Sequence, residues 1–457
     1  MYHQIFHVGN IIFYILLAVF GVLLIQKIIY HIFGLFPSKK FPDAKADHKY
    51  AILIPARNES KVIAGLLDSI QKQNYNKNLL KTFVIVESQD DPTCEICKNY
   101  ENTEVFVRQH LENKGKGYAL DEVVKHIFAS GEKFEAFFIC DADNVLDKNF
   151  VAEMNKCFDA GYKLCLGYRN SKNWNDGWVA SCSALTFSMV NTFQNKSKAR
   201  FNRNVVVSGT GFYISADILE ELGGWDFCTL TEDYEISTFS TLHNIKSTYN
   251  EYAEYYDEQP TSLKTSWNQR LRWCKGYSQV NKKYNKKLIK SVLFDKEKRL
   301  NKLEYVFSIL PVMGLVATTL LYTIFTFVLA IVGSCIGSAF AWPVWRAFIT
   351  VVGAMYMFFV LYSTIMLIAE RKHTNITMKN SLICCLMSPF YWACYVPIYV
   401  TALFKKTVEW KPIAHNVRML DDGKTEVEVT LEEGTRKTES AETKEEKESK
   451  SASQKDE

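Results

Sequence analysis

The chain has 457 residues, enough for about three domains of ~150 residues or for one large domain with membrane segments. Hydrophobic residues make up 48% and charged residues 23% of the chain, so for most of its length the composition excludes disorder and fibrous repeats. The net charge of +4 is too small for the basic field that nucleic-acid binding needs, so we expect no nucleic-acid partner. The 12 Cys are irregularly spaced, which indicates a reducing compartment and no disulfide framework.

The first apolar segment covers residues 9–36. It has no charged side chain before Lys27 and is long enough to cross ~30 Å of hydrocarbon as a helix. No Lys or Arg precedes it, which argues against a cleaved signal peptide. Lysines follow it, among them Lys39 and Lys40, so the positive-inside rule predicts an external N-terminus and a cytoplasmic next domain.

Residues 46–260 predict a soluble α/β domain. Three short apolar runs, at residues 50–55, 82–86 and 134–140, are typical of buried strands, and each is followed by acidic residues and a helical pattern. Strands that alternate with helices predict a mostly parallel sheet, in which ligands bind at the carboxyl ends of the strands. The acidic residues after the three runs therefore mark this edge of the sheet as a candidate site.

Two acidic pairs carry potential chemistry. Asp141 and Asp143 follow the third run and can hold a hard divalent cation together with diphosphate oxygens, although a D-x-D sequence alone is more often a solvated turn. Glu232 and Asp233 begin a helical run, where acids also suit an ordinary helix start. The glycine-rich basic loop around Lys116 lacks the spacing of a P-loop, and only its context can bring that lysine to a nucleotide.

Residues 261–300 predict amphipathic helices at the membrane interface. Apolar residues at helical spacing alternate with Arg270, Arg272 and Lys275, a pattern typical of a helix that lies on anionic headgroups. The same segment can also bring Arg272 and Trp273 to an active site, and the two interpretations are compatible.

The C-terminal region, residues 305–404, contains long charge-free stretches, from which we expect two or three membrane crossings. Four crossings in the whole chain would place Lys405 and Lys406 outside. The last, proline-containing stretch is therefore predicted to be re-entrant or interfacial. Residues 405–420 are expected to be a cytoplasmic Trp/His segment, and residues 421–457 a disordered polar tail.

The order of these motifs resembles that of the membrane-integrated family 2 glycosyltransferases over roughly residues 50–280. This group includes the cellulose, chitin, hyaluronan and poly-N-acetylglucosamine synthases and the ceramide glucosyltransferase type. Any one motif is weak, but the whole set in this order is specific. The motifs are Pro55-Ala-Arg-Asn-Glu59, the acids after Val86, Gly115-Lys-Gly-Tyr-Ala-Leu120, Asp141-Ala-Asp143, Gly209-Thr-Gly-Phe212, Gly223-Gly-Trp225, Thr231-Glu-Asp233 and Gln269-Arg-Leu-Arg-Trp273.

The resemblance implies a GT-A glycosyltransferase domain, an α/β fold with a Rossmann-like, mostly parallel sheet, flanked by transmembrane helices. It also implies a UDP-sugar donor and a metal ion, Mg²⁺ or Mn²⁺, held by Asp141 and Asp143. Glu87 departs from the family pattern, which usually has Asp there. The residues that the resemblance assigns to the nucleotide sugar are Pro55, Glu59, Glu87, Asp91, Lys116 and Asp141.

For the reaction, the resemblance implies that Asp233 is the general base that deprotonates an acceptor hydroxyl, with inversion at the anomeric carbon. A Trp/His motif at residues 410–415 resembles the segment that often closes such active sites. The catalytic residues implied are Glu232, Asp233, Gln269, Arg270, Arg272 and Trp273, and the acceptor-binding residues are Gly209, Thr210, Gly211 and Trp225.

The leading interpretation is an enzyme that builds a β-linked polysaccharide from UDP-glucose or UDP-N-acetylglucosamine. The alternative is transfer of one sugar to a membrane lipid; a scaffold or translocation subunit is disfavoured because Asp141, Asp143 and Asp233 are all present. The expected partners are the donor, a growing glycan or lipid acceptor and membrane lipids. An accessory membrane subunit or a second copy of the chain is also expected, because so few membrane spans do not enclose a pore by themselves. The expected location is a bacterial plasma membrane.

Overall fold

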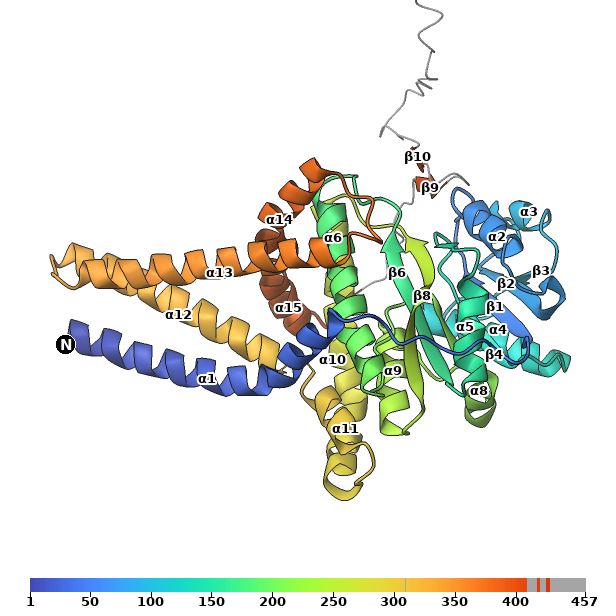
Figure 1. Cartoon of the computed structure of the whole chain (residues 1–457), viewed down its shortest axis with the longest axis horizontal. Coiled ribbons are helices and arrows are strands. Elements are labelled where there is room, and N and C mark those ends of the chain that lie inside the picture. Colours follow the sequence, from blue (N-terminus) through green and yellow to red (C-terminus); the bar gives the residue numbers. More distant parts are fainter. Residues whose placement is uncertain (309, 409–416, 420–424, 428–457) are drawn as a thin grey trace, which may run out of the picture.

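The structure is a computed structural model that describes residues 1–308, 310–408, 417–419 and 425–427. An α/β domain lies at one end, and three long helices extend away from it in one direction (Figure 1). The Trp/His motif expected at residues 410–415 lies outside the described residues, as does all of the expected polar tail except residues 425–427.

The domain is built on a mixed sheet of eight strands. These strands are β1 (Tyr50–Pro55), β2 (Leu80–Val86), β3 (Thr103–Val107), β4 (Ala136–Ile139), β5 (Val145–Leu146), β6 (Leu164–Ser171), β7 (Phe212–Ser215) and β8 (Ser247–Asp257). Their order is β3-β2-β1-β4-β7-β6-β8-β5; β3, β2, β1 and β4 are parallel, β6 is parallel to β8, and β7 and β5 are antiparallel to their neighbours. The predicted α/β class is confirmed, and all of the strands except β7 and β5 share one carboxyl edge.

Helices cover both faces of the sheet, which is why the central strands are continuous apolar runs. On β1, Ala51 and Leu53 face one core, while Tyr50, Ile52 and Ile54 face the other, as the two-residue period of a strand requires. The helices that pack on the first face are α4 (Lys116–Ser130), α8 (Ala216–Leu222) and α9 (Glu232–Leu242), and those on the second are α2 (Ile63–Gln71), α3 (Thr93–Cys97) and α5 (Phe150–Asp159).

A second group of helices joins the domain to the long apolar ones. A continuous helical segment follows β6, and its middle part is π-helical. Its parts are α6 (Trp178–Met189), η2 (Val190–Lys196) and α7 (Ser197–Arg200); the basic helices α10 (Leu263–Phe294) and α11 (Arg299–Val306) follow β8.

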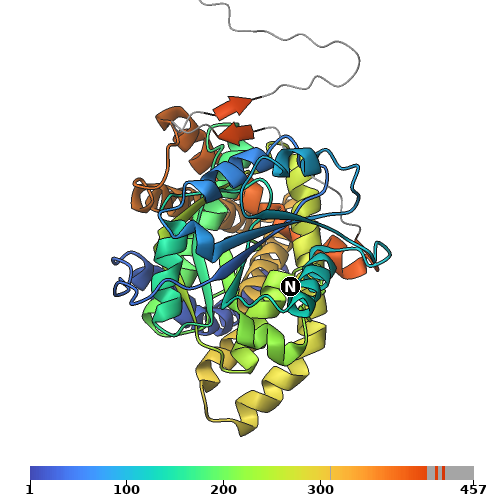
Figure 2. The same ribbon diagram turned by 90° about the vertical axis from the view of Figure 1, so that its right-hand side faces the viewer.

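Four helical stretches are long and apolar enough to cross a membrane. Three of them, α1 (Tyr2–Gly34), α12 (Leu310–Cys335) and α13 (Ala341–Ala369), pack side by side and extend together from the domain (Figure 1). The fourth is divided into α14 (Met378–Ala393), which contains Pro389, and α15 (Tyr395–Phe404). α14 packs against α13 and α6, and α15 packs against α10. Both lie beside the domain, at an angle to the three long helices (Figures 1 and 2).

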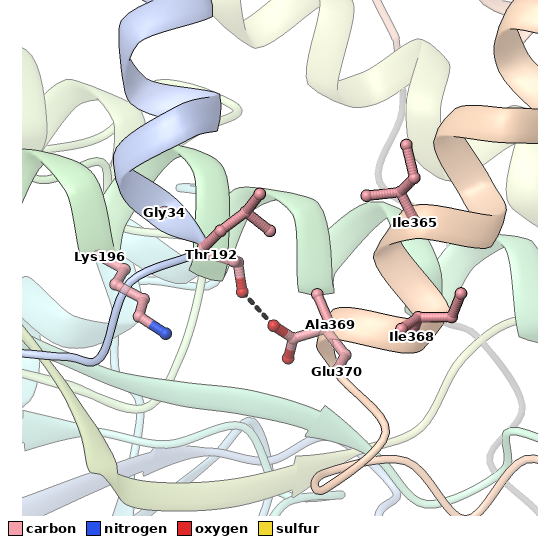
Figure 3. Close-up of a pocket in the computed structure, with 8 residues that line it drawn as sticks. Gly34, Thr192, Lys196, Ile365, Ile368, Ala369 and Glu370 are labelled. Atoms are coloured by element: carbon pink, nitrogen blue, oxygen red, sulfur yellow. Dashed lines mark hydrogen bonds between the residues drawn. The ribbon is translucent and has the colours of Figure 1, made fainter.

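The junction between α13 and the domain is polar. Glu370, at the end of α13, is buried and accepts hydrogen bonds from the hydroxyls of Tyr168 in β6 and Thr192 in η2. Figure 3 shows Thr192 and Glu370 beside a pocket of about 280 Å³ that also contacts the end of α1. Three residues further on, His373 stacks on Tyr168 and forms ion pairs with β8. The long helices are therefore attached to the strands that carry the candidate site.

Candidate active site

The loop after β4 presents the first candidate residue at the carboxyl edge. The backbone NH of Asp141 donates to Thr210 Oγ1 at 2.8 Å and to Asn144 Oδ1 at 3.1 Å. These bonds hold the loop in place, and the Asp141 side chain itself remains 37% exposed. Thr210 is fully buried, so its hydroxyl shapes the loop and does not face an acceptor.

Lys116 connects the two acidic pairs that the sequence singled out. Its ammonium lies 2.5 Å from Asp141 Oδ1, 2.8 Å from the carbonyl oxygen of Gly209 and 3.9 Å from Glu232 Oε1. Lys116 is the first residue of α4, and α4 approaches this closely because Gly117 has no side chain. A Cβ at Gly117 would lie 2.0 Å from the carbonyl oxygen of Phe227, in the loop between α8 and α9. The close packing of α4 thus places a cation between β4 and α9.

Glu232 and Asp233 begin α9 beside this cation. Burial raises the pKa of Glu232 to about 7, although the charge of Lys116 lowers it. Burial also raises the pKa of Asp233, against the lowering effects of Arg272 and Lys116. A carboxylate with a raised pKa accepts a proton more readily near neutral pH. Gly209 lies next to this group, since a Cβ there would be 3.8 Å from Asp233 Oδ2.

A further acidic residue, absent from the sequence prediction, lies beside Asp143. The Asp143 side chain is buried and contacts that of Asp257, the last residue of β8. Arg169 of β6 donates through Nε to Asp257 Oδ2 at 2.8 Å, and Asn144 Nδ2 donates to Asp257 Oδ1 at 3.1 Å. Burial raises the pKa of Asp257, while the Arg169 guanidinium lowers it. One buried cation therefore balances two buried carboxylates only in part.

The sequence did carry a signal for Asp257 and Arg169. Arg169 lies near the carboxyl end of the buried strand β6 and Asp257 ends β8, at the same edge of the sheet as Asp141. Glu251 and Glu254 interrupt the apolar pattern of β8, so the strand was not recognised from its hydrophobicity. Only the parallel pairing of β6 with β8 shows that these residues reach the site.

Four of the six residues predicted to bind the nucleotide sugar gather at the ends of β1 and β2 or just after them, whereas Lys116 begins α4 and Asp141 follows β4. Asp91 holds this corner together, because its carboxylate accepts from the backbone NH groups of Asn58 at 2.8 Å and Thr93 at 2.9 Å. Glu87 forms an ion pair with Arg57, with Nε and Oε2 3.0 Å apart. The other predicted residues at this corner are Pro55, which ends β1, and Glu59.

Helix α10 covers the start of α9 at very close range. A Cβ at Gly276 would lie 2.5 Å from Thr231 Oγ1 and 2.8 Å from the backbone nitrogen of Thr231. This approach brings Arg272 beside the acidic pair, and its Nη1 donates to the carbonyl oxygen of Leu230 at 3.2 Å. The positive charge of Arg272 lowers the pKa of Asp233.

An aromatic contact connects α10 with the Arg169–Asp257 pair. Trp273 meets Phe187 of α6 edge to face, with ring centroids 5.8 Å apart. The Arg169 guanidinium lies 3.7 Å from the centroid of the same Phe187 ring. Trp273 and Gln269 are both partly exposed, so they are available to a ligand.

Three of the predicted residues do not join this group. Arg270 is fully buried between the rings of Tyr391 and Tyr395, and its Nη1 donates to the carbonyl oxygen of Tyr391 at 2.8 Å. It therefore attaches α10 to α14 and α15. Trp225 is 1% exposed within the hydrophobic core beneath α4. Neither side chain is positioned to contact an acceptor, and Gly211 likewise packs its backbone on the Tyr255 ring.

Mg²⁺ and Mn²⁺ prefer hard oxygen ligands, which this group of residues offers. In the part of the chain that the structure describes, no group of three or more His, Cys, Asp or Glu side chains is arranged to hold a metal ion. Asp141 and Asp143 offer hard carboxylate oxygens, and Asp257 adds a second buried negative charge beside Asp143. Such ions usually take one or two carboxylates and keep their other positions for water and phosphate oxygens, so these residues fit an open site.

The fold and this group of residues are those of a glycosyltransferase with a GT-A type of domain. The family described as glycosyltransferase-like family 2 matches residues 48–276, half of the chain, and the chain belongs to this family. The resemblance seen in the sequence is thereby confirmed.

The chain is similar to two bacterial proteins in particular. It is 25% identical over 448 residues to a probable glycosyltransferase of Bacillus subtilis, in an alignment that covers 88% of this chain and 97% of that protein. It is 24% identical over 242 residues to the poly-β-1,6-N-acetyl-D-glucosamine synthase of Staphylococcus epidermidis, which covers 52% of this chain and 57% of the synthase. This second match thus spans just over half of the synthase.

A solved structure shares the fold. A mannosyltransferase of Pyrobaculum calidifontis, determined in complex with GDP-mannose and Mn²⁺, superposes with a TM-score of 0.55 and 15% sequence identity. The superposition covers 89% of this chain and all of the mannosyltransferase chain. It confirms the GT-A type of fold predicted from the motifs.

Proposed function

We propose that this glycosyltransferase is an inverting enzyme that adds sugars from a UDP-sugar to a growing β-linked glycan. The observation that carries the proposal is the placement of Asp233 beside Lys116 and Arg272 at the carboxyl edge of a GT-A sheet. N-acetylglucosamine is the proposed sugar, because the similar staphylococcal proteins are poly-N-acetylglucosamine synthases.

Each residue of the group has a proposed task. Asp233 takes the proton from the attacking hydroxyl of the acceptor, and its raised pKa suits that task. Lys116 and Arg272 place positive charge where a departing diphosphate develops negative charge. Trp273 and Gln269 contact the acceptor, with the flat Trp273 ring as a surface for a sugar.

Asp141 and Asp143 are proposed to hold Mg²⁺ or Mn²⁺ on the diphosphate. When bound, the ion neutralises charge on the leaving nucleotide. Asp257, which the Arg169 guanidinium holds in place, contacts Asp143 and orients its side chain. We expect that EDTA stops transfer and that Asp143→Ala loses Mn²⁺-dependent UDP binding, measured by calorimetry. Equal UDP binding with Mn²⁺ and with EDTA would remove the metal from the proposal.

The membrane arrangement is proposed to have three crossings. α1, α12 and α13 lie side by side, whereas α14 and α15 lie at an angle to them beside the domain. With α14 and α15 at the interface, the N-terminus is outside and the catalytic domain inside, which agrees with the basic residues that follow α1 and α15. Because three helices enclose little space, export of a long glycan would need a second copy or another membrane subunit.

The size of the product tests the proposed function. Purified full-length enzyme in nanodiscs would receive Mn²⁺ and one radiolabelled UDP-sugar at a time, followed by gel filtration and lipid extraction. Label from UDP-N-acetylglucosamine in a large, glycosidase-sensitive fraction is the expected result. Label in the organic phase as one discrete species would instead establish transfer of a single sugar to a lipid, the second candidate.

A further inference from the structure

A cavity of about 180 Å³ lies between the catalytic domain and the first apolar helix. Its walls come from α1, the η2–α7 segment, the start of α9, and α10 and α11. Lys27, Lys198 and Glu304 supply its charges, and Tyr277 and Tyr234, the residue after Asp233, also line it. It is large compared with the ~30 Å³ that a water molecule occupies in the liquid.

The charges of this cavity do not balance. Glu304 is saturated: Lys198 Nζ lies 2.9 Å from its Oε1, while Gln26 Nε2 and the Tyr30 hydroxyl each donate to its Oε2 at 2.9 Å. Within the residues that the structure describes, the ammonium of Lys27 has neither a hydrogen bond nor an ion pair. The cavity therefore carries two lysines against one carboxylate and is left with one positive charge.

Hydrogen-bond donors face the same space. The Tyr277 hydroxyl makes no hydrogen bond to any described residue, and Tyr234 donates to or accepts from Ser308 at 2.9 Å. An unpaired ammonium together with the free Tyr277 hydroxyl suits a singly charged oxyanion, because both groups can donate to its oxygens.

The position of the cavity indicates where this anion comes from. Lys27 lies seven residues before Gly34, where α1 ends, and Ser308 lies just before α12 begins. Both helices are long and apolar enough to cross a membrane, so the cavity lies where a bilayer presents its headgroups. A lysine near the end of a spanning helix is costly to bury unless its ammonium meets the headgroup region.

The pocket at the end of α13 differs from this cavity in charge. There Lys196 is paired with Glu251 at 3.1 Å, and Glu370 accepts from two hydroxyls, as Figure 3 shows for Thr192. Each charge of that pocket already has its partner. Of these two pockets, the cavity at Lys27 is the one with a net charge to attract a ligand.

We propose that the Lys27 cavity binds the phosphate of a membrane lipid headgroup, with Lys27 as its counter-ion and the Tyr277 hydroxyl as a donor. The bound lipid occupies the space between α1 and α10 and so supports the helix that carries Arg272 over Asp233. This proposal rests on the membrane placement of α1 but not on the identity of the transferred sugar.

Native mass spectrometry of the purified full-length enzyme tests the proposal. The protein is first reconstituted in nanodiscs of phosphatidylcholine and phosphatidylglycerol in equal parts and then released into detergent. After this release it should retain one phospholipid. Lys27→Gln should lose it, Lys27→Arg should keep it, and Lys286→Gln, on the exposed face of α10, should leave it unchanged. No retained lipid in the wild type, or equal retention in Lys27→Gln, would overturn the proposal.

Two further experiments identify the source of the bound phosphate and the effect of the bound lipid on sugar transfer. Inorganic phosphate at millimolar concentration should not displace the lipid; displacement would show a site for soluble phosphate and overturn the lipid assignment. Sugar transfer in the mixed nanodiscs should exceed that in pure phosphatidylcholine by about fivefold for the wild type and not for Lys27→Gln, the effect of one lysine at an anionic surface. Retained lipid without any transfer would contradict the proposed function and leave the lipid site standing.

Discussion

At the scale of single residues, the site depends on charges that are placed before any substrate arrives. Lys116 lies between Asp141 and Glu232, and Arg272 stands beside Asp233. Burial raises the pKa of the acids at the start of α9, and the charges of Lys116 and Arg272 act against this rise.

Asp233→Asn should reduce turnover by about 10²- to 10⁴-fold, because the amide cannot accept the proton of the acceptor hydroxyl. UDP binding should change by no more than a few-fold, since four of the six residues predicted to bind the nucleotide sugar lie at the ends of β1 and β2 or just after them. Labelled-sugar transfer and calorimetry with UDP measure the two effects, with exposed Asp226→Asn as the matched control. Near-normal turnover of the Asp233 variant would show that Asp233 is not the general base.

The pH profile should show the raised pKa of Asp233 directly. Because the base works when deprotonated, kcat/KM should fall as the pH decreases, and this fall should occur above the ordinary Asp value of 3.8. Arg272 lowers the pKa of Asp233, so Arg272→Gln should move the acid limb to higher pH. An unmoved limb in that variant would show that Arg272 does not act on the titrating group.

At the scale of elements, two helix contacts decide whether the site is assembled. α10 approaches α9 through Gly276, and the segment after α13 attaches the apolar helices to β8 through His373. Neither residue is part of the catalytic group, so both test how the elements position it.

Gly276→Ala should lower transfer by about 10- to 100-fold, because a methyl group there meets the backbone nitrogen of Thr231 at 2.8 Å and must displace α10. UDP binding should be retained. Gly353→Ala in α13 is the matched control, since its new Cβ would meet nothing within 4 Å. Full activity of the Gly276 variant would show that α10 does not need this close approach.

His373→Gln should destabilise the junction at neutral pH. Burial lowers the pKa of His373, but its bonds to Glu251 and Glu254 outweigh this and raise the pKa to about 10. Since this value exceeds the ordinary 6.5, the stabilisation is complete below pH 6.5 and is lost as the pH rises through about 10.

We expect the loss to be about 1.5–3 kcal/mol, the range for hydrogen bonds to charged groups. Thermal unfolding of wild type and His373→Gln should therefore differ at pH 6 and converge above pH 10, with exposed His110→Gln as the control. A difference that stayed constant with pH would mean that the ring stacks on Tyr168 without a contribution from its charge.

At the scale of the whole molecule, the arrangement of the apolar helices decides the topology. Fluorescent-protein fusions at the C-terminus should fold and fluoresce in bacteria, as expected for the cytoplasmic side, and a tag between α12 and α13 should be accessible from outside. These results follow if α14 and α15 lie at the interface and only three helices cross. A C-terminus accessible from outside would require a fourth crossing.

The sequence by itself determined the fold class, the family and the edge of the sheet where the acids gather. It could do so because buried parallel strands are continuous apolar runs, and because their carboxyl ends share one edge. Asp141, Lys116, Asp233 and Arg272 were all predicted from their order along the chain, and the structure places them together.

Tertiary structure decided what no local pattern could show. Asp257 and Arg169 reach Asp143 only because β6 pairs with β8, and Arg270 and Trp225 turn inward although they belong to motifs. The direction of a side chain depends on what packs against its helix or strand. The order of the motifs shows which residues are present in the chain. The packing of α10 on α9 and α15 determines which of these residues lie in contact.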